Sequence, residues 1–279
     1  MSQTWFITGT SSGFGRLLTE RLLEQGHRVA ATLRRPAVID GLKDRFGDQL
    51  WTARLDVTDT AAVREVVGRA FGELGRIDVV VNNAGYGLFC AVEEADDDQI
   101  RQIMDTNVIG SMQVIRAALP KLRAQGGGRI LQVSSAGGQT TYPNFSYYHA
   151  SKWAIEGFTE TIAREVAPFG IGVTIVEPGA TGTSFAASLV TAPLMPEYDS
   201  TPAGDTRRAI ADGSFEISGD PDKMVLAIID SVGQQPAPLR LALGKDTYVD
   251  VRASLVRRLE ELEAQKDVAL AAVLSPVTG

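Results

Sequence analysis

The amino-acid sequence predicts an α/β protein: a doubly wound, parallel sheet of seven strands with helices on both faces. Apolar runs rich in Val and Ile recur along the chain, and they are continuous rather than alternating, as is typical of strands covered on both faces. Segments of helical period separate these runs, so that strand and helix alternate. Because the 279 residues show no internal repeat, we expect residues 1–279 to form a single domain.

The expected elements follow one another in regular order. Strands are expected at residues 5–7, 27–33, 50–57, 77–81, 129–133, 172–176 and 239–243. Helices are expected at residues 14–22, 60–73, 97–123, 145–167 and 221–232. Gly26 marks the end of the first helix, while Asp220 and Pro221 mark the start of the last as N-cap and first helical residue. In such a fold the ligand binds beyond the carboxyl ends of the strands, where the strand order reverses.

Two segments lie outside this alternation. Residues 180–211 follow the sixth strand on the expected ligand side, contain several prolines and show no clear period. A connection of this length is commonly functional, so we expect a substrate lid. Residues 246–279 are expected to form a C-terminal helical extension, because apolar residues recur there at helical spacing between charges. These residues are Val251, Leu255, Leu259 and Leu262.

Composition narrows the class of partner. A net charge of -7 offers no basic field to nucleic acid or to anionic lipid, which leaves a small molecule as the expected ligand. The single cysteine, Cys90, excludes an intramolecular disulfide, and with only two histidines we expect no metal site. No apolar run approaches the roughly 20 residues that span a bilayer, and no leader precedes the first strand. We therefore expect a cytoplasmic protein without a membrane segment.

A glycine-rich turn connects the first strand to the first helix. Its glycines follow a Gly-x3-Gly-x-Gly spacing, which lets the backbone turn tightly and approach a diphosphate at the helix N-terminus. A plain strand-to-helix turn is the alternative, but the flanking elements favour nucleotide binding in a Rossmann-type sheet. The expected contacts are Gly9, Ser11, Ser12, Gly13, Phe14 and Gly15.

Further motifs follow in order along the chain. They are Asn82-Asn83-Ala84-Gly85 after the fourth strand, Asn107, Ser134-Ser135, Tyr148 with Lys152, Pro178-Gly179 and Thr183. With the glycine turn, this set resembles the short-chain dehydrogenase/reductase family from Thr8 to Thr183. The resemblance implies a dinucleotide-dependent oxidoreductase that acts on a carbonyl or a secondary alcohol. It also implies a homodimer or homotetramer, because in the family the helices at 97–123 and 145–167 often contact other subunits.

The spacing of Tyr148 and Lys152 indicates acid/base chemistry. Residues i and i+4 share one face of a helix, which places the ammonium close to the phenol. The cation favours the phenolate, and the oxidised nicotinamide ring adds to this effect, so we expect a lowered pKa for Tyr148. Lys152 is expected to hold the nicotinamide ribose as well.

Two further residues are expected to assist Tyr148. Ser135, at the carboxyl end of the fifth strand, is expected to hydrogen-bond the substrate carbonyl and stabilise developing negative charge. Ser134 is the competing candidate, but a spacing of thirteen residues to Tyr148 favours Ser135. The resemblance implies that Asn107 supports a water-mediated proton relay to Lys152. A structural brace is the alternative, since a buried amide needs hydrogen-bond partners.

The end of the second strand indicates the choice of cofactor. An acidic residue there would hold the 2'-hydroxyl of NAD, but this position is Leu33, followed by Arg34 and Arg35, which can pair with a 2'-phosphate. We therefore expect NADP(H), with solvated surface arginines as the alternative. The other expected cofactor contacts are Asp56 and Val57 at adenine, Asn83, Ala84 and Gly85 at the adenosine ribose, and Pro178, Gly179, Thr181 and Thr183 at the nicotinamide. Helix capping is an equal alternative for Asp56.

Aromatic and apolar residues near the expected ligand side are candidates for the substrate pocket. They are Tyr86, Tyr142, Phe145, Phe185 and Leu189. Their chemistry favours a hydrophobic or ring-bearing ketone, and the full set predicts an NADP(H)-dependent carbonyl reductase. Two alternatives stay open: a protein that binds NADP(H) without turnover, and an NAD-linked alcohol dehydrogenase.

Overall fold

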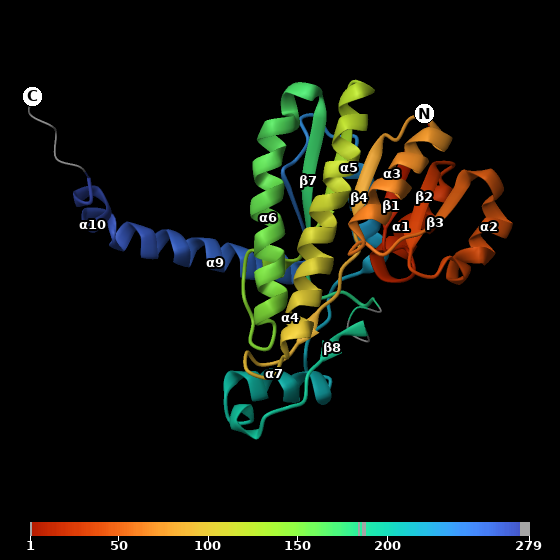
Figure 1. Cartoon of the computed structure of the whole chain (residues 1–279). Coiled ribbons are helices and arrows are strands. Elements are labelled where there is room, and N and C mark those ends of the chain that lie inside the picture. The colour runs from red at the N-terminus through yellow and green to blue at the C-terminus, as the bar shows by residue number, and fades with distance from the viewer. Residues whose placement is uncertain (1, 184, 186–187, 274–279) are drawn as a thin grey trace, which may run out of the picture.

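One parallel sheet of seven strands forms the centre of the protein (Figure 1). The computed structural model describes residues 2–183, 185 and 188–273. The sheet order is β3-β2-β1-β4-β6-β7-β9, so the strand order reverses between β1 and β4 as predicted. The strands are β1 (Thr4–Thr8), β2 (Arg28–Leu33), β3 (Leu50–Arg54), β4 (Val79–Asn82), β6 (Gly128–Val133), β7 (Ile171–Pro178) and β9 (Arg240–Leu243).

Most of the α-helices cover the two faces of this sheet, and the others lie beyond it (Figure 1). The α-helices are α1 (Gly13–Glu24), α2 (Asp40–Phe46), α3 (Thr60–Leu74), α4 (Asp97–Met104), α5 (Ser111–Ala124), α6 (Ser146–Val166), α7 (Pro202–Ala211), α8 (Pro221–Ser231), α9 (Lys245–Ala264) and α10 (Lys266–Ala271). A π-helix, Asp105–Gly110, joins α4 to α5, so the helix predicted at 97–123 is continuous but changes its winding. Short 3-10 helices lie at Pro36–Ile39, Gly47–Gln49, Ala136–Gly138, Ala167–Phe169 and Pro196–Tyr198.

The strands divide their side chains between two buried layers. In β1, Phe6 packs with α3, α5 and α6, whereas its neighbours Trp5 and Ile7 pack with α1 and α8 on the opposite face. Alternate side chains of a strand point to opposite faces, so a strand with helices on both sides must be apolar throughout. This explains why the continuous apolar runs predicted the sheet correctly.

The segment predicted as a lid contains regular structure that the sequence did not indicate. In it, β8 (Val190–Thr191) pairs in parallel with β5 (Leu88–Phe89), and α7 follows after a 3-10 turn. Figure 1 shows β8 and α7 together at one end of the molecule. The sequence therefore missed these elements within 180–211, while the role of the segment as a substrate lid stays a prediction. Long-range pairing of two-residue strands leaves no local pattern to read.

The structure differs from the prediction in smaller ways between β2 and β3 and at the C-terminal end of the chain. The short helix α2 was missed, and β3 ends at Arg54, three residues before its predicted end. The predicted C-terminal helix is confirmed as α9, which projects from the body of the protein (Figure 1). Its apolar residues diverge: Val251 is buried against the body, whereas Leu255 and Leu259 are more than half exposed, at 51% and 58%.

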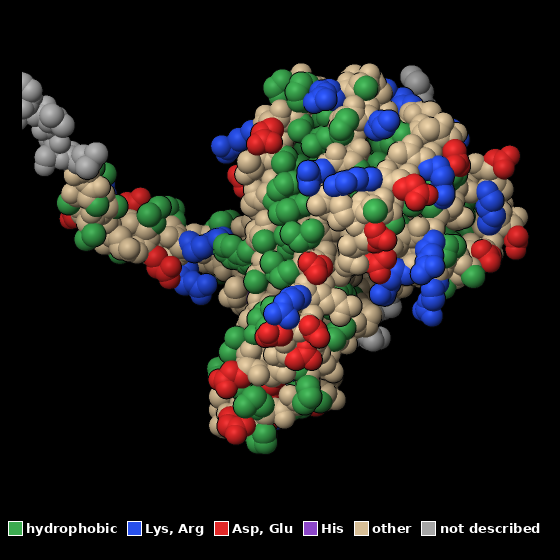
Figure 2. Space-filling model, in the orientation of Figure 1, with side chains coloured by type: hydrophobic (Ala, Val, Ile, Leu, Met, Phe, Trp, Pro, Cys, Tyr) green, Lys and Arg blue, Asp and Glu red, His purple; other side chains and the backbone are tan. Residues whose placement is uncertain are grey.

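Within the described residues, every helix is too short or too polar to cross a lipid bilayer. Hydrophobic side chains nevertheless gather on the surface over α5 and α6 (Figure 2). Among the large apolar residues exposed in this part of the chain are Trp153 and Phe169, at 39% and 44%. This surface bears on the assembly considered below.

Candidate active site

The fold brings Tyr148, Lys152, Ser135 and Asn107 into one region. Tyr148 and Lys152 lie one turn apart in α6, and both are buried. The Lys152 Nζ is 5.5 Å from the centre of the Tyr148 ring and donates a hydrogen bond of 3.1 Å to the Val133 carbonyl at the end of β6. Ser135 follows β6 directly and begins the 3-10 turn 136–138. Four predicted residues from three elements therefore converge.

Burial dominates the protonation of Tyr148. It raises the pKa of the phenol to about 12, and hydrogen bonding with the Ser135 hydroxyl only partly opposes the rise. We expected Lys152 and the oxidised nicotinamide ring to lower this pKa; in the protein without a cofactor, burial of the phenol raises it instead. Tyr148 is therefore a protonated donor at neutral pH.

Lys152 has the opposite shift for the same reason. Burial lowers the pKa of its ammonium to about 8, and the nearby Glu156 carboxylate works against this decrease. Lys152 is thus still mainly charged at neutral pH, but it loses its proton within the mildly alkaline range. The pair consequently has one group that titrates close to physiological pH.

Of the two serines, Ser134 is already engaged. Its hydroxyl donates a hydrogen bond of 2.6 Å to Glu156, which is buried. Ser135 accepts a hydrogen bond from the Gly137 backbone N–H at 3.1 Å and makes only a long contact of 3.5 Å to the Pro178 carbonyl. The hydroxyl of Ser135 therefore remains available beside Tyr148, in agreement with the spacing argument.

The Asn107 side chain makes a network of structural hydrogen bonds in the π-helix. Its Oδ1 accepts from the Tyr86 N–H at 3.1 Å, while its Nδ2 donates to the Tyr86 carbonyl at 2.9 Å and to the Ser151 hydroxyl at 3.0 Å. A Cβ added to Gly85 would lie only 3.0 Å from Oδ1. The side chain thus braces the end of β4, as the alternative interpretation proposed.

The glycine turn fits a close backbone approach. Gly9 has φ +73, and a Cβ there would lie 2.8 Å from the Ala84 Cα. A Cβ on Gly15 would clash with the Gly9 carbonyl and with the Asn83 side chain. Asn83 fixes this geometry by donating hydrogen bonds to the carbonyls of Thr8, at 2.9 Å, and Gly9, at 3.0 Å.

Helix α1 begins within this turn, at Gly13, so that Gly15 lies in its first turn. Its N-cap residue, Ser12, makes no side-chain capping hydrogen bond. The N-terminal N–H groups of a helix without such a cap are suited to a negatively charged group. The turn therefore fits the diphosphate of a dinucleotide, which the sequence predicted for it.

The residues predicted to contact the adenine and the 2'-phosphate of the cofactor follow β2 and β3. Arg34 and Arg35 directly follow β2 and are exposed, and in the described part of the chain neither forms an ion pair with a carboxylate. Asp56 accepts hydrogen bonds from the N–H and hydroxyl of Thr58, at 3.0 and 2.8 Å. The cap of α3 is Asp59, so the alternative of helix capping by Asp56 was wrong. Val57 is buried.

The turn after β7 has a partner that sequence reasoning missed. The N–H of Ala180 donates a hydrogen bond of 2.6 Å to Asp246, in the first turn of α9. A Cβ on Gly179 would clash with the same carboxylate. Thr181 bonds back to the Gly179 carbonyl at 2.8 Å, and the Thr183 N–H bonds to the Thr181 carbonyl at 2.7 Å. The C-terminal extension therefore supports the predicted nicotinamide segment, for which no local sequence signal exists.

Apolar side chains surround the Tyr148 phenol. The ring centres of Phe145 and Phe185 lie 5.9 and 5.7 Å from that of Tyr148. Phe185 and Leu189 both approach Gly87, where a Cβ would have no room. Tyr142 is farther along: its hydroxyl donates a hydrogen bond of 3.1 Å to Asp250 of α9, and burial with this carboxylate raises its pKa.

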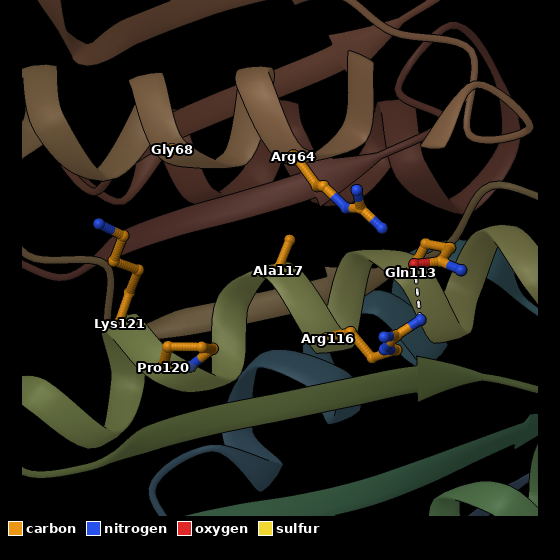
Figure 3. A pocket seen from close by; sticks show the side chains of 7 residues that line it. All are labelled: Arg64, Gly68, Gln113, Arg116, Ala117, Pro120 and Lys121. Atoms are coloured by element: carbon orange, nitrogen blue, oxygen red, sulfur yellow. Dashed lines mark hydrogen bonds between the residues drawn. The ribbon is translucent and has the colours of Figure 1, made fainter. Parts of the chain in front are cut away.

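A separate hollow of about 340 Å³ lies on the surface between two helices (Figure 3). All the side chains that line it belong to α3 or α5: Arg64, Gly68, Gln113, Arg116, Ala117, Pro120 and Lys121. None of the predicted site residues lines this hollow.

A doubly wound sheet with a glycine turn at its switch point and a buried Tyr-Lys pair defines a dinucleotide-dependent oxidoreductase. The protein-family model described as short chain dehydrogenase matches residues 3–193. The chain belongs to the short-chain dehydrogenase/reductase family, as the resemblance implied.

Individual relatives agree with this assignment. The chain is 38% identical over 247 residues to oxidoreductase BOA17 of Botryotinia fuckeliana, a match that covers 88% of this chain and 90% of that protein. A solved short-chain dehydrogenase from Streptomyces avermitilis is 36% identical, with a TM-score of 0.91 and 98% of each chain covered. The closed form of a serine dehydrogenase complexed with NADP+ is 29% identical, with a TM-score of 0.72 over 86% of this chain and 92% of that chain.

Proposed function

We propose that the protein is an NADP(H)-dependent reductase that interconverts a carbonyl and a secondary alcohol on a hydrophobic or ring-bearing small molecule. The observation that carries this proposal is the convergence of Tyr148, Lys152 and Ser135 in one buried region beside the glycine turn. When bound, the reduced nicotinamide supplies a hydride to the carbonyl carbon.

The side chains divide the remaining work. Ser135 donates a hydrogen bond to the carbonyl oxygen and stabilises the negative charge that develops on it. Tyr148 then gives its phenolic proton to that oxygen. Because burial keeps the phenol protonated at neutral pH, Tyr148 is already in the state that reduction requires. Lys152 stabilises the phenolate that remains, and its low pKa lets it return a proton.

The preference for NADP(H) rests on the end of β2. Leu33 offers no carboxylate to repel a 2'-phosphate, and the exposed guanidinium groups of Arg34 and Arg35 are free to pair with one. The fit of a nucleotide to the turn is supported independently by the absence of space for a Cβ at Gly9 and Gly15.

The substrate class rests on the surroundings of Tyr148. Phe145 and Phe185 offer aromatic surface beside the phenol, and Leu189 meets Phe185 at Gly87, which favours an apolar ketone over a small polar one. The hydrophobic surface over α5 and α6 supports a homo-oligomer, because large exposed apolar patches commonly mark subunit contacts (Figure 2).

The test compares cofactor binding with turnover. NADPH and NADH are titrated by fluorescence, and NADPH oxidation is followed with small, aromatic and steroidal ketones, with Tyr148→Phe as the matched control. We expect tighter binding of NADPH, and a loss of turnover by a factor of about 10² to 10⁴ in the variant with NADPH binding retained. Tight binding without Tyr148-dependent turnover on any ketone would instead support a sensor that binds NADP(H). Preference for NADH would support an NAD-linked dehydrogenase.

A further inference from the structure

Two buried glutamates lie directly behind the active-site residues. Glu156 is in α6, one turn beyond Lys152, and Glu177 is the penultimate residue of β7, next to Pro178. Each is only 2% exposed. Carboxylates are rarely buried to this extent unless they are paired, because desolvating each charge costs several kcal/mol.

The two carboxyl groups share one cation. The Arg240 Nε lies 3.6 Å from Glu156 Oε2 and 3.2 Å from Glu177 Oε1, and the other end of this guanidinium bonds to Glu160 at 2.6 Å. Glu177 Oε1 has no hydrogen bond of good geometry in the described part of the chain. Burial and the neighbouring Glu156 raise the pKa of Glu177 to about 8, so it is protonated at neutral pH and can donate to Glu156.

Glu156 in turn holds both ends of the segment that carries Ser135. Its Oε1 accepts the hydrogen bond of 2.6 Å from Ser134, and its Oε2 accepts one from the Gln139 side chain. A Cβ on Gly138 would clash with this carboxylate, so the glycine lets the carboxylate approach the backbone of the turn. The turn 134–139 is thereby tied to the helix that carries Tyr148 and Lys152.

We propose that Glu156 is a positioning residue for Ser135, and that Glu177, which shares the Arg240 guanidinium with it, supports it from β7. This proposal rests on the proposed function, since it gives Glu156 a role in carbonyl reduction. The Ser134 and Gln139 contacts fix the turn on both sides of Ser135, and Glu177 connects it to Pro178, whose carbonyl faces the Ser135 hydroxyl. The groups that face Glu156 are therefore Lys152, Ser134, Gln139, Glu177 and Arg240.

The variant Glu156→Gln tests the proposal, because glutamine keeps the size of the side chain but cannot accept at both ends. We expect kcat with the best ketone to fall by about 10-fold to 100-fold while the KM for NADPH stays within about twofold. Glu160→Gln is the matched control: it lies one turn farther along the same helix and also bonds Arg240, but it does not touch the turn. We expect it to leave both constants within about twofold.

Two further variants keep the proposal testable if Glu156→Gln does not fold. Ser134→Ala removes the hydrogen bond from Ser134 to Glu156 while leaving the glutamate in place. It should lower kcat several-fold with an unchanged KM for NADPH. The double variant of Ser134→Ala and Glu156→Gln should lower kcat no further than Glu156→Gln alone, because both substitutions remove the same contact. Equal kcat values for Glu156→Gln, Ser134→Ala and Glu160→Gln would overturn the positioning role.

The pairing of Glu156 with Glu177 can be tested by a stability measurement that does not depend on enzyme activity. Because the pKa of Glu177 is raised in the folded state, its stabilising contribution is present at low pH and is lost as the pH rises through about 8. The melting temperature of Glu177→Gln should therefore increase relative to the unmodified protein between pH 6 and pH 9. A constant difference would refute the shared proton. If the unmodified protein reduces no ketone, the proposed function fails, while this measurement still decides on the pair.

Discussion

Replacing Arg207 by methionine should release the segment around α7 from the body of the protein. Arg207 donates a hydrogen bond of 2.6 Å to Glu94 and another of 3.2 Å to the Asn144 side chain. The side chains of Glu94 and Arg207 are 0% and 10% exposed. Asn144 in turn donates 2.7 Å to the carbonyl of Ala203, in α7, and has φ +66. This ion pair therefore joins α7 to the segment that follows β5.

The magnitude follows from what the substitution leaves behind. Removing one partner of a buried ion pair costs about 3–5 kcal/mol, mainly because the remaining charge is buried without compensation. Glu94 keeps hydrogen bonds of 2.7 Å from the N–H groups of Ala91 and Met195. We therefore expect a cost of about 3 kcal/mol. The double variant Glu94→Gln with Arg207→Met should cost less than Arg207→Met alone, because no charge is left buried.

The assay is urea unfolding at several pH values, with limited proteolysis of the segment 195–211. Burial alone would raise the pKa of Glu94, but hydrogen bonds from Met195, Ala91 and Arg207 outweigh it and lower the pKa. The contribution of the pair is thus present above the unfolded pKa of the carboxyl and is lost as the pH falls through the folded value. A cost below about 1 kcal/mol at pH 7, or a cost that does not shrink in acid, would refute this reasoning.

Three further predictions concern the site. Lys152→Met should raise the free energy of unfolding at pH 7, because lowering the pKa from 10.5 to about 8 costs up to about 3 kcal/mol; the gain, measured with urea, should disappear as the pH approaches 10.5. Gly15→Ala should abolish NADPH binding in a fluorescence titration with the fold retained by circular dichroism, because its Cβ displaces the Gly9 carbonyl. Arg34→Ala should weaken NADPH binding by about 10-fold and leave NADH binding unchanged; equal losses for both would contradict a contact with the 2'-phosphate.

The sequence predicted the sheet well because its signals are local. The apolar run of β1 and the glycines after it are read directly from neighbouring residues, and Tyr148 and Lys152 meet because one helix turn separates them. The missed contacts join distant segments instead. Glu94 and Arg207 are 113 residues apart, and nothing in either neighbourhood indicates that they pair.

Burial explains why the pKa of Tyr148 is raised where the sequence predicted a decrease. The sequence shows that Lys152 lies beside Tyr148, but it does not show how completely both are removed from water. The desolvation of the phenolate decides the pKa of Tyr148, and it depends on the packing of several elements around the ring. From the sequence, the structural role of Asn107 could be proposed only as an alternative, because tertiary structure decides which partners a buried amide finds.

The bond between Asp246 and Ala180 decides where the chain can be shortened. The first turns of α9 hold the nicotinamide segment through Asp246 and reach the 139–142 segment through Asp250 and Ser254. A protein cut back to residues 3–193, which the family model matches, would lose these supports, although it would still carry every recognised motif. The stretch 260–273 is exposed, which makes it a better place to truncate or to attach a tag.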